Sequence, residues 1–483
     1  MKKILMLLLT AMMTTALVTS CKKFTEITPK GNSLLNRVSD LELILNFNFS
    51  ATTASGDTLA TKTTAQAAFS PNDVANLVND TYAYSTNIPS IISNKEQSLN
   101  YAYTVYDEAL DRKNLAVTDI KYEKLYFIIN NVCNVVLKNA DAASGDRTKA
   151  NQLKAEAYIL RAYLHYLLVN FYAKGYNPET AAKDGGIPYV KEDNLTTELN
   201  KKLTVEEVYT NIMSDINAAF ALNSLPKTPV NNMRVGLAFA YGVKAQVLIT
   251  MHKYSDALTA ADASLSVNNF INDDRQFAPA GTQKFEKIQP VAPENLFYMG
   301  ANGSPILASL SVEMNSVFEP GNVIDSYVKP YYPLGNPFSN VPGSKLWLYS
   351  ASTYAINTAG LTTSNTYLIK AECLARTGNI SGALDIINLI RQRRINPSIY
   401  APVAASTEAE TMTILKRTAR IEYLYTMQNY LNIKRWNTEV NYKQDINRFI
   451  GGVTYTLKPE SSLWIFPFPQ SATNYNPGLT QNY

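Results

Sequence analysis

The sequence predicts a mainly α-helical protein, built as a tetratricopeptide-like scaffold of paired helices with a loop-rich insertion that carries short strands. Apolar residues recur at helical spacing on both sides of residues 268–363, whereas that stretch is rich in Pro, Gly, Asn and aromatic residues. Residues 244–258 (KAQVLITMHKYSDAL) align without gaps on residues 370–384 (KAECLARTGNISGAL). Each copy is predicted to form a helix, a tight turn and a second helix opening on Ala-Leu, so the repeat indicates stacked helix hairpins.

The N-terminus is typical of a lipoprotein signal. Lys2 and Lys3 precede an apolar run that is too short to span a membrane and that ends in VTSC at residues 18–21. This ending is typical of a bacterial lipobox, in which the thiol of Cys21 carries a diacylglycerol. We therefore expect a lipoprotein signal peptide at residues 1–20 and a lipid anchor on Cys21. The alternative is an ordinary signal peptide with an incidental cysteine.

The helices are predicted in chain order from their periodicity. Ser33 or Ser39-Asp40 is a candidate cap for the helix LELILNFNF (41–49), and the Ala/Thr/Ser-rich residues 51–70 are predicted to form a loop. Further helices are expected at 118–140, 147–173, 204–222, 233–252, 254–267, 364–377, 380–395 and 407–436. The first two of these form a candidate third hairpin.

The chain is long enough for one large domain or two intertwined ones. We expect residues 21–267 to form an N-terminal helical region and residues 268–483 a C-terminal region that contains the insertion. The two regions are expected to intertwine into one globular unit.

The composition argues against a nucleic-acid-binding protein and against a membrane-spanning one. The formal net charge is +4, or +2 without Lys2 and Lys3, and charges of both signs are mixed, which gives no electrostatic footprint for nucleic acid. No segment after the signal is apolar enough to span a bilayer. Cys133 and Cys373 lie in helical apolar patterns and are expected to be buried thiols, with a disulfide between them as the less favoured alternative.

The sequence carries no recognisable catalytic motif, so we predict a protein that is not an enzyme and that needs no metal or cofactor. His165 and His252 are the two histidines, they are far apart, and neither stands in a zinc-ligand pattern. No G-x-S-x-G, Walker or dinucleotide-binding motif is present. A lipid-anchored glycosidase is the enzymatic alternative, because its two catalytic acids can lie far apart in the chain.

Tyrosine is the outlier in composition, with 31 residues beside 17 Phe and 3 Trp. Aromatic rings in loops rich in Asn and Pro suit the apolar C–H faces of sugars, and they form the predicted ligand-binding set. The set consists of Tyr82, Tyr84, Tyr331, Tyr332, Trp347 and Tyr349. The alternative for each ring is packing of its loop onto the helices. Trp464 and the Arg435–Trp436 pair are expected to be structural.

Five segments in order resemble the SusD/RagB family of outer-membrane nutrient-binding lipoproteins. They are CKKFTEITPKG (21–31), the long helix and its Gly-Ile-Pro stop (153–190), the central helix pair (233–265), the late pair (367–393) and LWIFPFPQSATNYNPGLTQNY (463–483). The segment RIEYLYTMQNYLNIKRW (420–436) departs from the family pattern at Thr426, Met427, Asn429 and Asn432.

The resemblance implies a lipoprotein of the outer membrane, exposed at the cell surface, that binds an oligosaccharide or polysaccharide and delivers it to a SusC-like TonB-dependent transporter. A peptide-binding importer of the same family is one alternative. A helical-repeat scaffold for envelope assembly is the other. Neither the identity of the ligand nor a bound calcium follows from the resemblance.

Overall fold

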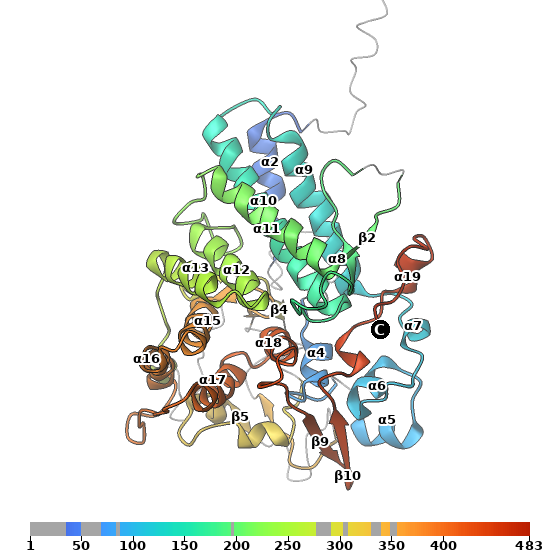
Figure 1. The fold of residues 1–483 in the computed structure, drawn as a ribbon, viewed down its shortest axis with the longest axis vertical. Coiled ribbons are helices and arrows are strands. Elements are labelled where there is room, and N and C mark those ends of the chain that lie inside the picture. Colours follow the sequence, from blue (N-terminus) through green and yellow to red (C-terminus); the bar gives the residue numbers. More distant parts are fainter. Residues whose placement is uncertain are drawn as a thin grey trace, which may run out of the picture.

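The computed structural model describes residues 35–49, 69–83, 87–194, 198–276, 291–302, 308–329, 340–347 and 355–483. Helices dominate these ranges, and the strands are short and paired in twos, as the sequence predicts. Figure 1 shows the long helices at one end of the molecule, the helix pairs along one side and a β-hairpin at the opposite end.

Helix α10 (Arg147–Tyr172) is the spine of the long-helix end. Asp146 caps it by accepting a hydrogen bond from the amide of Thr148 at 2.8 Å. Packed around α10 are α2 (Val38–Leu45), α8 (Ile120–Ile128), the π-helical turn η1 (Ile129–Cys133), α9 (Asn134–Asn139) and α11 (Val205–Ala221). The candidate hairpin of 118–140 with 147–173 is therefore confirmed, with a π-helical turn in its first helix.

The internal repeat forms two stacked hairpins. Its first copy is α12 (Leu237–Thr250) with α13 (Tyr254–Val267), its second is α15 (Thr363–Arg376) with α16 (Ile380–Gln392), and α13 packs against α15. His252 and Gly378 occupy equivalent turn positions, and both adopt a left-handed backbone, with φ of 59° and 87°. Small alanines such as Ala257 and Ala261 allow the helices to approach Ile369 closely.

The predicted helical segment 407–436 is divided into α17 (Glu408–Glu422) and α18 (Gln428–Trp436). The chain turns at Tyr425, which has φ of 62°, and the amide of Met427 bonds the carbonyl of Thr358 at 2.8 Å. Periodicity alone did not show this break, because all nine residues of α18 are buried and the helix has no exposed face to mark where it begins.

The insertion contributes the short strands that the sequence predicts. Three antiparallel pairs form there: β3 (Asn295–Phe297) with β8 (Leu361–Thr362), β4 (Ala301–Asn302) with β7 (Ala355–Ile356), and β5 (Val328–Lys329) with β6 (Leu346–Trp347). The 3-10 turn η2 (Asp274–Gln276) precedes these strands, and η3 (Glu313–Ser316) and η4 (Val323–Tyr327) lie between β4 and β5.

Several small elements were not predicted. They are α4 (Asn72–Leu77), α5 (Ile88–Asn94), α6 (Leu99–Val105), α7 (Arg112–Leu115), β1 (Gly185–Pro188), β2 (Lys202–Thr204), β9 (Ile446–Ile450), β10 (Val453–Leu457), η5 (Ser462–Trp464) and α19 (Gln470–Thr473). Strand β1 pairs with β2, and β9 pairs with β10.

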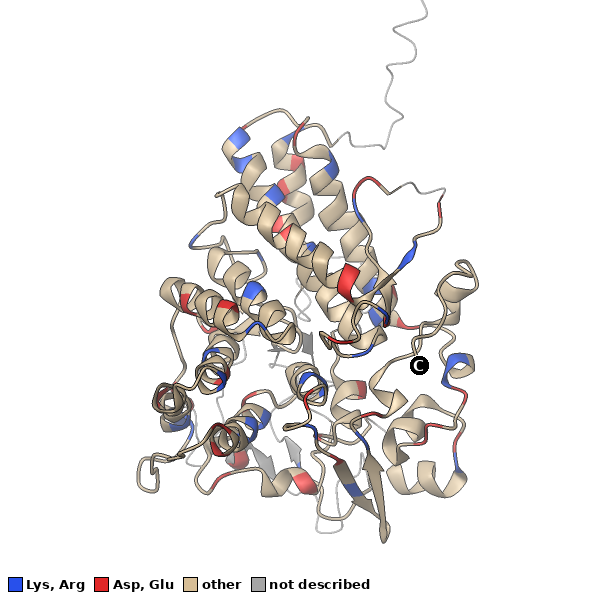
Figure 2. Ribbon diagram, viewed as in Figure 1, with Lys and Arg blue, Asp and Glu red and all other residues tan. Residues whose placement is uncertain are grey.

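One hydrophobic cluster includes residues from Val38 to Leu479 and takes in α10, the repeat hairpins and the terminal segment. Trp464 lies within it, as expected. Figure 2 shows Lys and Arg interspersed with Asp and Glu over the described elements. No helix among the described residues is both long and apolar enough to cross a membrane.

Candidate ligand-binding site

Backbone pairing connects described residues that stand next to the predicted ligand-binding rings in the sequence. Thr81 forms a bridge with Leu310, and Leu310 forms a second bridge with Lys345. Beyond Lys345, Trp347 in β6 pairs with Val328 in β5. Described residues that border the predicted rings, at 81–83, 328–329 and 345–347, are therefore connected by backbone pairing, although they are far apart in the sequence.

Most of the predicted residues lie outside the part of the chain that the structure describes. These are Cys21, Tyr84, Tyr331, Tyr332 and Tyr349. Trp347 is placed by its backbone in β6, and its role in ligand binding stays a prediction.

Tyr82 is fully buried. Its hydroxyl accepts a hydrogen bond from the amide of Val312 at 3.2 Å, and its own amide bonds the carbonyl of Ser309 at 2.9 Å. Burial raises the pKa of the Tyr82 phenol to about 12. In this arrangement the ring fastens residues 81–83 to 309–312, which is the packing alternative considered for each ring.

An apolar cavity opens beside this region and is here called the hairpin pocket. Its volume is about 520 Å³. It is lined by Pro89, Ile92, Ser93, Val312, Val341, Pro342, Phe449, Ile450, Gly451, Val453 and Tyr455. Helix α5, the ends of the gathered segments and the β9–β10 hairpin therefore share one wall, and the lining favours apolar parts of a ligand.

The hairpin pocket was missed by sequence reasoning, although its main element has a sequence signal. INRFI and VTYTL flank Gly451-Gly452, and two alternating runs around Gly-Gly are a standard hairpin pattern. The contribution of α5 could not be foreseen, because it depends on a contact between residues more than 350 positions apart.

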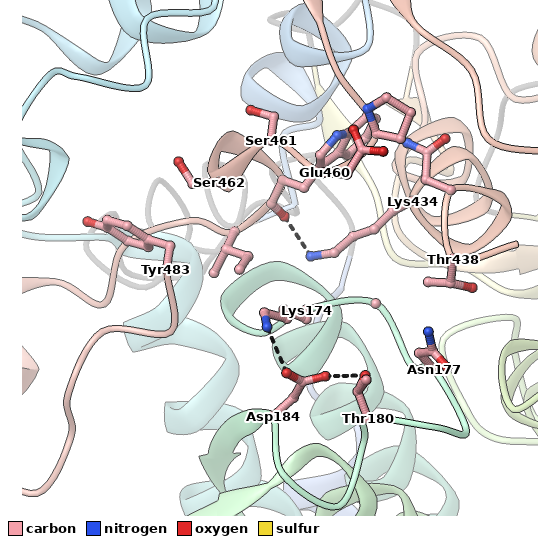
Figure 3. A pocket seen from close by; sticks show the side chains of 15 residues that line it. Lys174, Asn177, Thr180, Asp184, Lys434, Thr438, Glu460, Ser461, Ser462 and Tyr483 are labelled. Carbon is pink, nitrogen blue, oxygen red and sulfur yellow. Dashed lines mark hydrogen bonds and ion pairs between the residues drawn. The ribbon is translucent and has the colours of Figure 1, made fainter. Parts of the chain in front are cut away.

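A second cavity, of about 390 Å³, lies where the C-terminal end of α10 meets α18, and is here called the lysine pocket (Figure 3). Lys434 is buried at its wall and donates to the carbonyls of Asn170, Ala173 and Trp464 at 2.6 to 2.7 Å. Burial lowers the pKa of this ammonium well below its ordinary value. Lys434 thus caps the C-terminal end of α10.

The mouth of the lysine pocket carries charges of both signs. Lys174 pairs with Asp184 at 2.8 Å, and Thr180 donates to the same carboxylate at 2.6 Å. Because these groups already satisfy one another, the geometry indicates a structural junction and not a prepared ligand cradle.

Both histidines have structural contacts. The ring of His165 stacks on Tyr189 with centroids 3.8 Å apart, and its Nε2 accepts a hydrogen bond from the amide of Val190 at 3.1 Å. His252 lies 3.2 Å from the hydroxyl of Thr438 through its Nε2. Within the described ranges, no group of three or more His, Cys, Asp or Glu side chains is placed to hold a metal ion.

The remaining structural expectations are confirmed. Cys133 and Cys373 are free and buried, so the disulfide alternative is wrong. The guanidinium of Arg435 lies 5.3 Å from the ring centroid of Trp436, as expected for a cation–π pair. Burial raises the pKa of both thiols, which makes them unreactive.

Two family models match the chain. Residues 46–248 match a SusD-like family described as starch-binding and associating with the outer membrane, and residues 349–483 match the SusD family. The SusD-like protein P2 of Formosa agariphila is 28% identical over 186 residues, which are 37% of this chain. The match spans about a third (34%) of the length of that relative.

Solved structures share the fold over most of the chain. A SusD superfamily protein from Bacteroides thetaiotaomicron superposes with a TM-score of 0.69 at 17% identity, covering 92% of this chain and all of that one. A SusD-like carbohydrate-binding protein from Bacteroides fragilis gives 0.64 at 18% identity, covering 92% and 99%. Surface glycan-binding protein A from Bacteroides uniformis gives 0.64 at 16% identity, covering 88% and 99%.

Proposed function

Because the chain belongs to the SusD/RagB family, which is associated with the outer membrane, we propose that it is a lipoprotein that binds a glycan for uptake. The observation that carries the proposal is the match of two SusD family models in order along one chain. The glycan binding of relatives and structural neighbours supports the choice of ligand. The anchor is Cys21, and the bound glycan passes to a SusC-like TonB-dependent transporter.

The ligand site lies where the aromatic segments converge. The bridges from Thr81 through Leu310 to Lys345 and the pairing of Val328 with Trp347 support this proposal, since these described residues border the predicted rings in the sequence. Aromatic faces supply the apolar contact that a pyranose ring needs, and neighbouring amides supply hydrogen bonds. The protein acts by binding, without turnover.

The test is retention of the purified chain, residues 22–483, on a panel of soluble polysaccharides, with released reducing ends measured in the same samples. We expect retention by one glycan class without new reducing ends. New reducing ends would replace the proposal by a glycosidase. Failure of every glycan to retain the protein would contradict glycan binding.

Paired substitutions then locate the site. Trp347→Ala and the double variant Tyr331→Ala/Tyr332→Ala should abolish retention, whereas Tyr82→Phe should leave it unchanged because that ring is buried. Thermal unfolding of each variant separates loss of the site from loss of the fold. Equal retention by all of them would place the glycan elsewhere.

The anchor and the transporter are tested in cells. Cys21→Ala should release the protein from the outer-membrane fraction and end its labelling by a radioactive fatty acid. The intact lipoprotein should co-purify with a TonB-dependent transporter after mild detergent extraction. A protein that stays membrane-bound and unlabelled would contradict the lipid anchor.

A further inference from the structure

The β9–β10 hairpin is closed by a two-residue turn whose geometry fixes which backbone groups point outward. Gly451 and Gly452 have φ of 60° and 83°, as a type I′ turn requires. Ile450 faces Val453 across this turn, so these two residues exchange hydrogen bonds. In the next pair, Phe449 and Thr454, the N–H and C=O groups therefore point away from the partner strand.

The outward edge of β9 is occupied. The carboxylate of Glu313 accepts from the amide of Phe449 at 2.7 Å, and the side-chain amide of Asn79 donates to the carbonyl of Asn447 at 2.9 Å. Both bonds fall on the residues that the turn geometry assigns to the outer edge, which supports that assignment.

Among the described residues, no group bonds to the outward edge of β10. By the same alternation its outward residues are Thr454 and Thr456. Their backbone N–H and C=O groups have no partner among the described residues, and Thr454 is exposed. In Figure 1 the hairpin projects at the end of the molecule opposite the long helices. Strand edges of this kind template pairing with another extended chain.

The hairpin pocket lies beside this edge. Val453 and Tyr455 line it from β10, and Ile92 lines it from α5. Val453 and Tyr455 lie on one face of the hairpin, because their opposite residues Ile450 and Arg448 are buried on that face. A strand added along β10 would alternate its side chains and place every second one toward this apolar cavity.

We propose that the β10 edge and the hairpin pocket together bind a short extended peptide by β-strand addition. Only a polypeptide main chain alternates donors and acceptors at the strand spacing, and the cavity adds preference for an aliphatic side chain. A stable interface between two folded proteins uses about 20–30 residues on each side, which is more than this patch offers. This patch has the eleven lining residues of the pocket and the two edge residues. The occupant is thus a free peptide.

The probe is the fluorescent peptide acetyl-Thr-Val-Thr-Ile-Ser-Lys-amide, labelled on its lysine and titrated with residues 22–483. Its aliphatic side chains stand at every second position and so fix which face meets the pocket. Two analogues are N-methylated, one on its odd and one on its even residues. We expect one analogue to bind at least tenfold more weakly and the other to bind like the parent peptide. Equal binding of all three, or no binding of the parent, would overturn the proposal.

Matched variants test the protein side. Thr454→Pro deletes one outward N–H without touching a bond inside the hairpin, and it should weaken the parent peptide at least tenfold. Thr454→Val keeps that N–H and should bind like the unmodified protein. Ile92→Ser should weaken binding through the pocket. Thermal unfolding shows which variants are folded. If Thr454→Pro does not fold, the two N-methylated peptides, tested on the unmodified protein, decide whether the proposal holds.

Other occupants give different results. Sedimentation that shows dimers lost in Thr454→Pro, without peptide binding, would assign the edge to a second copy of the chain. Glycan retention that is lost in Thr454→Pro, without peptide binding, would assign it to the glycan. Either result would overturn the proposal that a peptide binds at this edge. If Thr454→Pro loses peptide binding but retains glycan binding, the peptide site and the glycan site are distinct, as proposed.

Discussion

Glu372 holds together side chains from two helices. From α15 its carboxylate accepts two hydrogen bonds from Arg435 at 2.7 Å each, and a third from the indole N–H of Trp436 at 3.0 Å. Burial alone would raise the pKa of Glu372, but Arg435, Arg376 and Trp436 outweigh burial and lower the pKa to about 2. The carboxylate therefore stays charged at neutral pH.

Glu372→Gln should destabilise the protein strongly, because an amide cannot neutralise the buried guanidinium of Arg435. Removing one partner of a buried ion pair costs about 3 to 5 kcal/mol. Urea unfolding at pH 7 measures this cost, and Glu179→Gln on the exposed surface serves as the control. Equal unfolding midpoints for the two variants would contradict the role of Glu372.

His165 predicts a separate dependence of stability on pH. Burial lowers the pKa of its ring to about 3, against 6.5 in an exposed histidine. Because the folded protein holds the neutral ring, its contribution is complete above pH 6.5 and falls as pH drops from 6.5 toward 3. The window of Glu372 lies lower, between 4.5 and about 2.

The unmodified protein should therefore lose about 2 kcal/mol of unfolding free energy between pH 7 and pH 5 through His165, at about 1.4 kcal/mol per pH unit. His165→Gln should be less stable at pH 7 but lose less over this interval. Urea midpoints at the two pH values measure both slopes. Parallel slopes would show that His165 does not set the dependence.

Sequence reasoning at this scale found residues with a role but not their partners. The Arg435–Trp436 contact was expected, whereas its carboxylate, Glu372, stands 63 residues away. Asn429 departs from the family pattern, and the structure shows why a polar residue fits: it donates to buried Asp80 at 2.7 Å, beside Arg420. Such partners depend on the tertiary fold and leave no local signal.

At the scale of elements, β1 needs glycine because neighbouring atoms lie too close to leave room for a side chain. A Cβ on Gly186 would lie 2.8 to 2.9 Å from the backbone of Leu203 and Thr204, which is closer than carbon atoms pack. Gly242 in α12 differs, since its Cβ would meet Leu296 and Leu361 at an ordinary 3.5 to 3.6 Å. The two positions therefore predict opposite effects of the same substitution.

Gly186→Ala should destabilise the protein, because backbone atoms of β2 must move to make room. Gly242→Ala should stabilise it by up to about 1 kcal/mol, because a helix interior favours alanine over glycine. Thermal unfolding of both variants gives the signs directly. A stabilised Gly186→Ala would show that β1 and β2 are not held at this spacing.

Long periodic helices were predictable from the sequence, and short elements were not. The repeat hairpins appear where expected because their apolar faces recur over 14 residues in α12 and in α15. Helices α4 to α7 span only four to seven residues, too few to show a period. These short helices are held in place by packing and by hydrogen bonds. Arg448, for example, donates to the carbonyls of Tyr103 and Thr104.

On the scale of the whole molecule, the C-terminal segment is bonded to the end of α10 and to the β1–β2 pair. Asn482 donates to the carbonyl of Tyr172 at 2.7 Å and to that of Gly186 at 2.8 Å, while Lys202 donates to the carbonyl of Thr480 at 2.8 Å. The Gly-Ile-Pro segment (186–188) and the C-terminal Leu-Thr-Gln-Asn segment (479–482) are far apart in the sequence, but they belong to one contact in the structure.

Asn482→Ala should loosen this junction, because two carbonyls lose their donor at a cost of about 1–3 kcal/mol. Hydrogen exchange should accelerate in β1 and at the end of α10. Asn474→Ala, on the exposed surface after α19, should leave those amides unchanged. Unaltered exchange in both variants would mean that the terminal segment rests on α10 without supporting it.

The architecture as a whole followed from few sequence features. The repeat and the helical periods predicted the scaffold, and the change of composition predicted the insertion. The pairing between residues near 81, 310 and 345 did not follow, because it depends on single bridges such as that between Thr81 and Leu310. The outward edge of β10 did not follow either, since a strand paired on one edge differs from a strand paired on both edges only in its neighbours.

The contact between Asn482 and Tyr172 also sets an order in time. The two residues are 310 positions apart, and ribosomes add about 5–20 residues each second. The end of α10 therefore waits roughly 15 to 60 seconds for the segment that completes it. During that delay Phe171 and Tyr172 at this end lack the rings of Phe466 and Phe468, which pack against them in the finished fold.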